Sequence, residues 1–105
     1  MKYLITESQF DNIIFKYLNN QDFVLMNRDN HIYFVNSEGD EHSQIKYYKN
    51  GGWCDIYGNL IYEISTFFSM KESDSEKVIG RWVENTLQMN VTNTFVHYFP
   101  VQVRS

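Results

Sequence analysis

The sequence predicts an α+β fold, in which an antiparallel β-meander of three to five strands has about three helices packed on one face. Three observations lead to this prediction. Apolar residues recur at helical spacing near the start and again in the second half, short runs rich in aromatic and β-branched residues lie between polar turns, and no linker or repeat divides the chain. A chain of 105 residues has the length of one domain, so we expect a single α+β domain over residues 1–105.

The first helix is expected to follow Thr6 and to end near Asn19. Thr6 and Gln9 have the spacing of a capping box, in which the two side chains satisfy backbone N–H groups at the helix start. Ile5 and Phe10 have the spacing of the hydrophobic staple. The apolar face recurs every three or four residues and comprises Phe10, Ile13, Ile14, Tyr17 and Leu18.

Three short strands and a shorter fourth are expected in the middle of the chain. Turns rich in Asn, Asp and Gly separate these strands, as in an antiparallel meander. The strand-like runs are 23–26, 31–35, 44–48 and 53–56.

The turn at 37–42 (SEGDEH) combines three carboxylates, a histidine and a glycine. We interpret it as the tip of a hairpin, because Gly39 supplies a positive φ and Asp40 tolerates a turn. A hard cation needs six or more oxygen ligands held in place, and an exposed tip holds few. We therefore expect neither a metal ion nor another cofactor at this turn.

The second helix is indicated by a change from strand alternation to helical spacing. Asn59 or Asp55 is expected to cap it, and Ser73 with Glu76 has the spacing of a second capping box, at the start of a third helix. The apolar face of the second helix comprises Leu60, Ile61, Ile64, Phe67 and Phe68.

The third helix contains Gly80, which costs about 1 kcal/mol relative to Ala in a helix interior. The close approach of a neighbouring backbone would explain this glycine. A final strand is expected over 94–103, and Pro100 places it at a sheet edge or bends it, because proline cannot donate to a ladder. The apolar side of the third helix comprises Val78, Ile79, Trp82, Val83, Thr86 and Leu87.

The composition narrows the range of partners. Aromatic residues make up 17% of the chain, more than a small core encloses easily, so some tyrosines are expected at the surface. The net charge is −4 and the nine Lys and Arg residues are scattered, so we expect no nucleic-acid partner. No apolar run is long enough to span a bilayer, so we expect no membrane association. Cys54 is the only cysteine and cannot form an intrachain disulfide, which fits a reducing compartment.

Two sets of residues are candidates for catalysis. Cys54 paired with a histidine would make a thiolate nucleophile, but a buried and inert thiol is the default for a cysteine beside Trp53 and Ile56. The acidic candidates suggest no acid–base pair and are explained as caps or solvated helix faces. We therefore expect no catalytic residue. The histidines are His31, His42 and His97, and the acids are Asp55, Glu63, Asp74, Glu76 and Glu84.

Five residues are candidates for a protein interface. Tyr33, Tyr47 and Tyr48 fall on neighbouring predicted strands, where they could line an exposed sheet face or pair across strands. Arg81 and Trp82 belong to residue types that anchor interfaces, although Trp82 lies on the apolar stripe of the third helix, where core packing is the simpler reading.

Four stretches carry a resemblance to known proteins: 1–10 (MKYLITESQF), 32–40 (IYFVNSEGD), 53–56 (WCDI) and 78–89 (VIGRWVENTLQM). They resemble a group of small bacteriophage proteins of marine origin to which no activity is attached. The resemblance covers most of the chain. It implies a setting, the cytoplasm of a bacterial host or the virion, and it assigns no role to any residue.

These observations favour a small non-catalytic protein-binding protein, in which a tyrosine-rich sheet face or the third helix engages a protein partner. The alternative is a structural subunit in which the same surface forms a homo-oligomer or joins a virion assembly. A small metal- or thiol-dependent enzyme is the second alternative. Bound metal or an unusually reactive thiol would be its signature.

Overall fold

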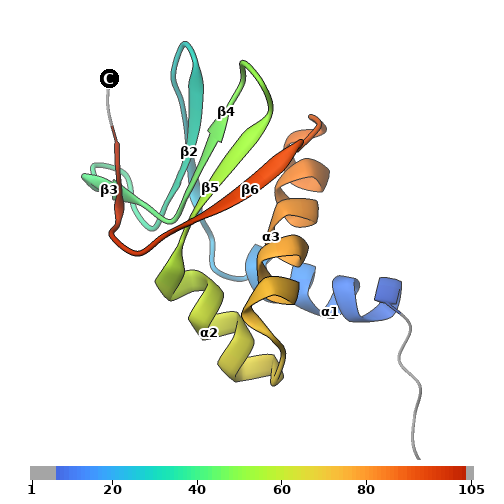
Figure 1. Cartoon of the computed structure of the whole chain (residues 1–105). Helices are drawn as coiled ribbons and strands as arrows, with labels where there is room; N and C mark the ends of the chain where they lie inside the picture. Colours follow the sequence, from blue (N-terminus) through green and yellow to red (C-terminus); the bar gives the residue numbers. More distant parts are fainter. Residues whose placement is uncertain (1–6, 104–105) are drawn as a thin grey trace, which may run out of the picture.

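The computed structural model describes residues 7–103 and contains three helices, a five-stranded sheet and a two-stranded ribbon (Figure 1). In chain order the elements are α1 (Glu7–Asn19), β1 (Val24–Asn27), β2 (His31–Val35), β3 (His42–Ser43), β4 (Ile45–Tyr48), β5 (Trp53–Tyr57), α2 (Gly58–Phe68), α3 (Glu72–Leu87), β6 (Asn93–His97) and β7 (Val101–Gln102). The predicted α+β class, with three helices and a mostly antiparallel sheet, is confirmed.

The strands of the larger sheet lie in the order β1-β2-β4-β5-β6. The first four are antiparallel neighbours, whereas β6 runs parallel to β5. The sheet is therefore mixed, and the prediction of a purely antiparallel meander needs this correction. The physical reason is the connection, because the chain crosses through α2 and α3 before it returns to the sheet, and such a long crossover lets the next strand run parallel.

The final strand-like run is divided between two sheets. β6 ends at His97, and after the turn that contains Pro100 the chain enters β7, which pairs with β3 (Figure 1). The run bends at the turn that contains Pro100, one of the two outcomes that its missing N–H donor led us to expect, and β6 is an edge strand of the larger sheet. The β3–β7 ribbon is fixed by a hydrogen bond of 3.2 Å from Ser43 Oγ to the carbonyl of Val101.

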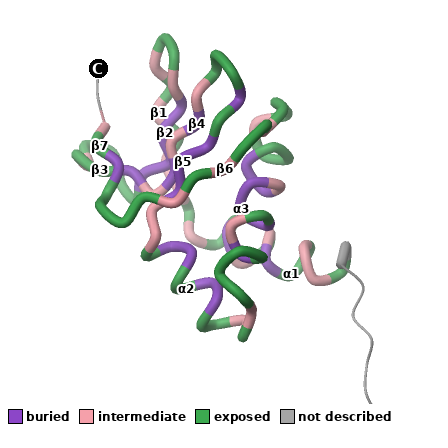
Figure 2. Tube along the Cα trace, in the orientation of Figure 1, coloured by how far each residue is buried: buried purple, intermediate pink, exposed green. Residues whose placement is uncertain are grey.

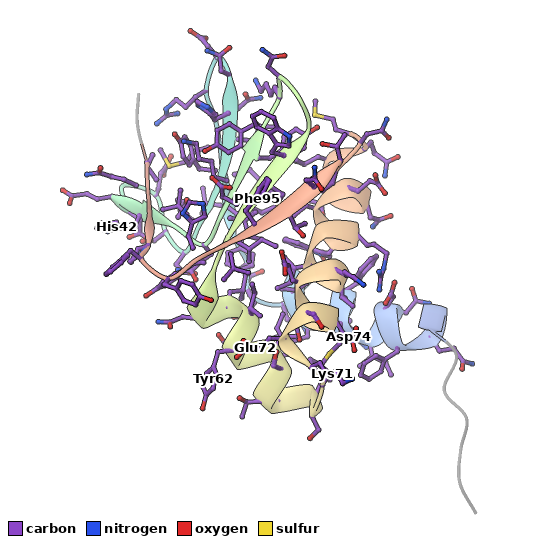
Figure 3. The ribbon with its side chains drawn as sticks, viewed as in Figure 1. His42, Tyr62, Lys71, Glu72, Asp74 and Phe95 are labelled. Carbon is purple, nitrogen blue, oxygen red and sulfur yellow. The ribbon has the colours of Figure 1, made fainter. Side chains whose placement is uncertain are left out.

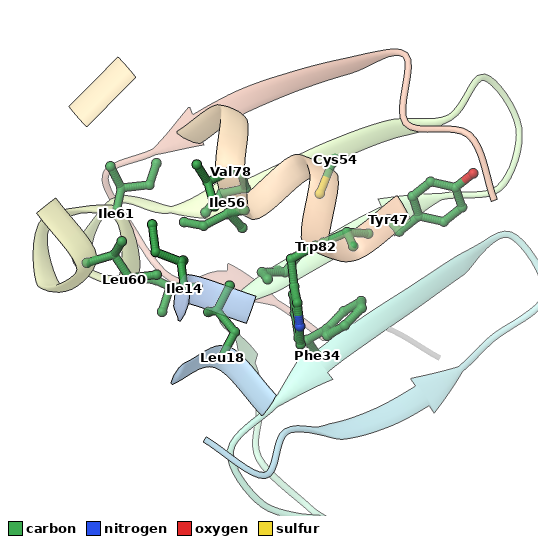
Figure 4. Packing of buried hydrophobic residues seen from close by; sticks show 14 of the residues in the cluster. Ile14, Leu18, Phe34, Tyr47, Cys54, Ile56, Leu60, Ile61, Val78 and Trp82 are labelled. Atoms are coloured by element: carbon green, nitrogen blue, oxygen red, sulfur yellow. The ribbon is translucent and has the colours of Figure 1, made fainter. Parts of the chain in front are cut away.

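One hydrophobic core combines residues of the three helices with residues of β2, β4 and β5. Trp82 of α3 packs beside Phe34 of β2, with their ring centroids 5.3 Å apart (Figure 4). Figure 2 shows exposed positions at the hairpin tips, between α2 and α3, and along β6 and the turn that follows it. Burial of each large apolar side chain stabilises the fold by roughly 1.5–3 kcal/mol. The core cluster is Ile14, Leu18, Ile32, Phe34, Ile45, Tyr47, Cys54, Ile56, Leu60, Ile61, Ile64, Val78, Ile79, Trp82 and Val83.

The helix ends differ from the capping predictions. The T-x-x-Q capping box and the staple of the first helix involve residues that lie outside the described part of the chain. α2 begins after Tyr57 and α3 after Lys71, and neither N-cap side chain makes a capping hydrogen bond. The predicted box of Ser73 and Glu76 is therefore wrong. Glu76 instead accepts a 2.9 Å hydrogen bond from Thr94 Oγ1, which ties α3 to β6.

Gly80 allows α3 to approach β6 closely. A Cβ at this position would lie 2.8 Å from Thr94 Cγ2, well inside van der Waals contact. The sequence suggested that a neighbouring backbone would explain this glycine, and the structure shows that the neighbour is a side chain. The close approach brings α3 and β6 together at one edge of the core.

Candidate functional site

The face of the larger sheet opposite the core carries the candidate site. Strand register places one residue from each of five strands in a single row: Met26, Tyr33, Lys46, Asp55 and Phe95. Because side chains alternate along a strand, residues two positions away lie on the same face. We call this surface the outer face, and it comprises Val24, Met26, His31, Tyr33, Val35, Lys46, Tyr48, Trp53, Asp55, Tyr57, Asn93, Phe95 and His97.

Asp55 is the centre of the polar groups on the outer face. It is buried, and Tyr48 Oη donates a 2.7 Å hydrogen bond to its Oδ2. Its other carboxylate oxygen lies 3.2 Å from Nε2 of His97, on the parallel strand β6. Burial, together with the hydrogen bond and the negative charge of Asp55, raises the pKa of Tyr48 to about 12. Tyr48 therefore remains a neutral donor to this carboxylate throughout the physiological range.

Lys46 is the remaining polar residue near Asp55 on the outer face. Among the described residues, no carboxylate is in direct contact with its ammonium group. Its Nζ lies 4.7 Å from the ring centroid of Tyr48 and 5.5 Å from that of Tyr33. The ring of His31 meets Tyr48 edge to face at 4.9 Å. Burial, and secondarily the charge of Lys46, lowers the pKa of His31. The cation is thus stabilised by aromatic faces.

Two large aromatic side chains on the outer face remain half exposed. Trp53 on β5 is 46% exposed and Phe95 on β6 is 47% exposed. The register pairs Asp55 with Phe95 and Trp53 with Asn93, so Trp53 and Phe95 are diagonal neighbours on adjacent strands. Trp53 also contacts Tyr48, at a ring centroid distance of 6.0 Å. Figure 3 shows Phe95 beside β6, on the side of the molecule turned toward the viewer.

The outer face is almost free of net charge. Among the five strands of the larger sheet, Lys46 is the only Lys or Arg and Asp55 is the only Asp or Glu. The two are partners in the β4–β5 register. A surface of this kind offers aromatic contact area, while its one buried carboxylate already has its hydrogen-bond donors.

The five residues predicted as an interface lie in different environments. Tyr33 is fully buried in the row beneath Lys46, and Tyr48 is partly buried beside it on the outer face. Tyr47 points to the core, where its hydroxyl donates to the carbonyl of Asn90 at 2.8 Å.

The two candidates on α3 lie elsewhere. Trp82 is 3% exposed and its Nε1 donates to Asn19 Oδ1 at 2.9 Å. Arg81 forms a two-pronged ion pair with Asp11 of α1, at 2.7 and 2.9 Å. This pair borders a hollow of about 410 Å³ between α1 and α3, lined also by Phe10, Met70 and Lys77. The rings of Tyr33, Tyr47 and Trp82 thus offer almost no surface to a partner. Tyr33 and Tyr48 share the outer face, whereas Tyr47 and Trp82 belong to the core cluster.

Sequence reasoning missed Trp53, Phe95 and His97 as members of one surface. The sequence shows these residue types but not that they share a surface. It suggested Asp55 only as a catalytic acid or as a helix cap. The available signal was the alternation in WCDI, which sends Trp53 and Asp55 to one face and Cys54 to the other. The parallel pairing with β6, which adds Phe95 and His97, has no signal in local sequence.

The cysteine and the histidines that a thiol enzyme would use lie in different parts of the structure. Cys54 is buried on the core face, whereas His31 and His97 lie on the outer face and His42 lies on the β3–β7 ribbon. Burial, and secondarily the charge of Asp55, raises the pKa of the Cys54 thiol to about 12. A thiol in this state is a poor nucleophile.

The SEGDEH turn has the local structure of a polar turn. Gly39 has a φ of 93°, the positive value that we predicted. Asp40 accepts hydrogen bonds from the Ser37 backbone N–H and from Ser37 Oγ, at 3.0 and 2.9 Å. Within the part of the chain that the structure describes, no group of three or more His, Cys, Asp or Glu side chains is arranged to hold a metal ion.

The comparisons with known proteins assign no family to this chain. No protein-family model, curated protein or solved structure matches the chain significantly. Over the described residues, no helix has the length and apolarity needed to cross a membrane.

Proposed function

We propose that this chain is a non-catalytic protein-binding module that engages another polypeptide through the outer face. The observation that carries the proposal is the pair of half-exposed aromatic side chains, Trp53 and Phe95, on a sheet face with almost no net charge. Aromatic residues are enriched in protein interfaces, where they contribute a large apolar area at a low cost in conformational entropy.

The polar groups of the face favour a protein partner over a nucleic acid. A nucleic acid is bound through several Lys or Arg contacts to phosphates, and the five strands supply only Lys46. The hydrogen-bonding groups of Asp55, Tyr48 and His97 are turned toward one another. Covering them with a protein therefore leaves no carboxylate without a donor.

The proposal takes the three helices to pack on the opposite face of the sheet. Its support is the core cluster, which combines helical residues only with those strand residues that point away from the outer face. We propose a partner in a bacterial host or in a virion, the setting that the resemblance to phage proteins implies. A structural role, in which the partner is another copy of the chain, is the second candidate function, and the near absence of net charge on the outer face favours it.

Photo-crosslinking from a defined position tests the proposal. A photoreactive phenylalanine analogue replaces Phe95, and the protein is irradiated in a bacterial lysate. The matched control places the same analogue at Phe67 of α2, which is 67% exposed and lies outside the outer face. We expect a discrete adduct with a polypeptide from position 95 alone. The absence of any adduct, or identical adducts from both positions, would contradict a binding role for the outer face.

A further inference from the structure

We infer that the outer face associates with the outer face of a second copy of this chain, in a two-fold symmetric dimer. The inference rests on the proposed function and names the partner of that same surface. Three features of the described residues support it: the distribution of charge, the internal pairing of the polar groups on the face, and the exposed aromatic area.

The charge distribution allows two copies to meet at this face and at few others. Among the helix residues whose side chains the structure describes, six are acidic and three are basic, so the helix surfaces repel a second copy. The acids are Asp11, Glu63, Glu72, Asp74, Glu76 and Glu84, and the bases are Lys16, Lys77 and Arg81. The five strands carry one charge of each sign. Association through the outer faces leaves the two acidic helical layers on opposite sides of the dimer.

The polar side chains of the outer face contact one another within one copy, so two identical outer faces can meet without separating these contacts. Asp55 is satisfied by Tyr48 and lies against His97 within the same copy. Lys46 rests over the ring of Tyr48. Because Asp55 already has a donor and Lys46 is the only Lys or Arg of the five strands, a strongly charged partner gains little from this face. An identical aromatic surface adds apolar contact and brings only one further charge of each sign.

The exposed aromatic area supplies part of the surface that a weak dimer needs. Phe and Trp side chains bury roughly 150–250 Å² each, and Trp53 and Phe95 are 46% and 47% exposed, so together they leave about 200 Å² uncovered. Specific interfaces bury at least about 1,000 Å² in total, or about 500 Å² per copy. A dimer must therefore also cover Asn93, His97 and the partly exposed residues of the outer face. A two-fold contact of this kind closes at two subunits.

The test is sedimentation equilibrium of the whole chain over a concentration range up to about 300 µM, a range suited to a dimer with micromolar affinity. We expect a monomer–dimer equilibrium that raised salt strengthens or leaves unchanged, because salt screens the repulsion between two chains of net charge −4. We also expect acrylamide to quench Trp53 less as the dimer forms. Trp82, which is buried, supplies a constant background that is measured in a Trp53→Phe variant.

Matched variants locate the contact. Phe95→Ser is expected to weaken the dimer by about tenfold or more, as truncation of an interface anchor does. Phe67→Ser removes an equally large exposed ring from α2 and is expected to leave the dimer constant unchanged. Circular dichroism verifies that both variants fold, which is expected because both side chains are substantially exposed.

The outcomes separate this inference from the proposed function. A chain that stays monomeric over the whole range overturns the dimer, as does an oligomer that Phe67→Ser weakens and Phe95→Ser does not, or one that grows beyond two copies. A monomeric chain that still crosslinks to a different protein from position 95 overturns the dimer and supports the binding function. A monomer that gives no adduct from position 95 overturns both.

Discussion

Replacing Gly80 by alanine tests the contact between α3 and β6. Alanine would favour the helix by about 1 kcal/mol in an open position. Here its Cβ would lie 2.8 Å from Thr94 Cγ2, so the methyl group of Thr94 must move. Rotation of Thr94 would also break the 2.9 Å hydrogen bond from its hydroxyl to Glu76.

The magnitude follows from these opposing terms. Overpacking a tight contact typically costs about 1–3 kcal/mol, and loss of the hydrogen bond costs about 1 kcal/mol more. After the gain in helix propensity, Gly80→Ala is expected to reduce the free energy of unfolding by about 1–3 kcal/mol. Urea denaturation followed by circular dichroism measures this difference.

A second substitution isolates the clash. Thr94→Ser removes the Cγ2 methyl and keeps the hydroxyl that bonds Glu76. In the Thr94→Ser background, Gly80→Ala is expected to be neutral or to stabilise the protein by up to about 1 kcal/mol, so the two substitutions should couple by about 1–4 kcal/mol. Stabilisation by Gly80→Ala in the wild-type background, or equal effects in both backgrounds, would refute the steric account of this glycine.

Three further predictions concern titratable groups. Asp55→Asn should lower the pKa of Tyr48 from about 12, because the carboxylate charge that holds the proton is lost while burial remains; an NMR titration of tyrosine Cζ that shows no downward shift would contradict this assignment. Iodoacetamide should alkylate Cys54 at pH 8 at least about 100-fold more slowly in the folded chain than in urea, because burial raises its pKa to about 12; equal rates would show an accessible thiol. Burial lowers the pKa of His31, so its contribution to stability is present above its unfolded pKa of 6.5 and is lost as the pH falls through the lower folded pKa; His31→Gln should flatten the acid limb of stability, and an unchanged acid limb would contradict this assignment.

Structural features that depend on residues close together in the sequence were predicted well. Helical spacing gave α1 with its end at Asn19, and it gave the apolar face of α3 around Val78 and Trp82. Polar turns gave the four antiparallel strands. These features could be predicted because the periodicity of burial and the chemistry of turns are set within a few residues.

Features that depend on tertiary partners were predicted poorly. The Ser73–Glu76 capping box is absent because Glu76 is engaged by Thr94, a residue 18 positions away in the chain. The interface candidates were chosen by residue type, and burial then depended on strand register: Tyr47 and Tyr48 are adjacent in sequence and lie on opposite faces of the sheet. The contribution of Phe95 depended on a parallel pairing that follows two helices.

The segment WCDI shows how this alternation decides what the protein can do. Cys54 faces the core and is desolvated, while its neighbour Asp55 faces the other way and is held by Tyr48. The thiol is therefore kept away from the histidines of the outer face, and a thiol–imidazole pair cannot form across the sheet. The same alternation places Trp53 beside the satisfied carboxylate, and strand pairing adds Phe95 to this surface. A face with its polar groups engaged and its aromatic rings exposed is suited to recognition by contact, and this is why we favour binding over catalysis for this chain.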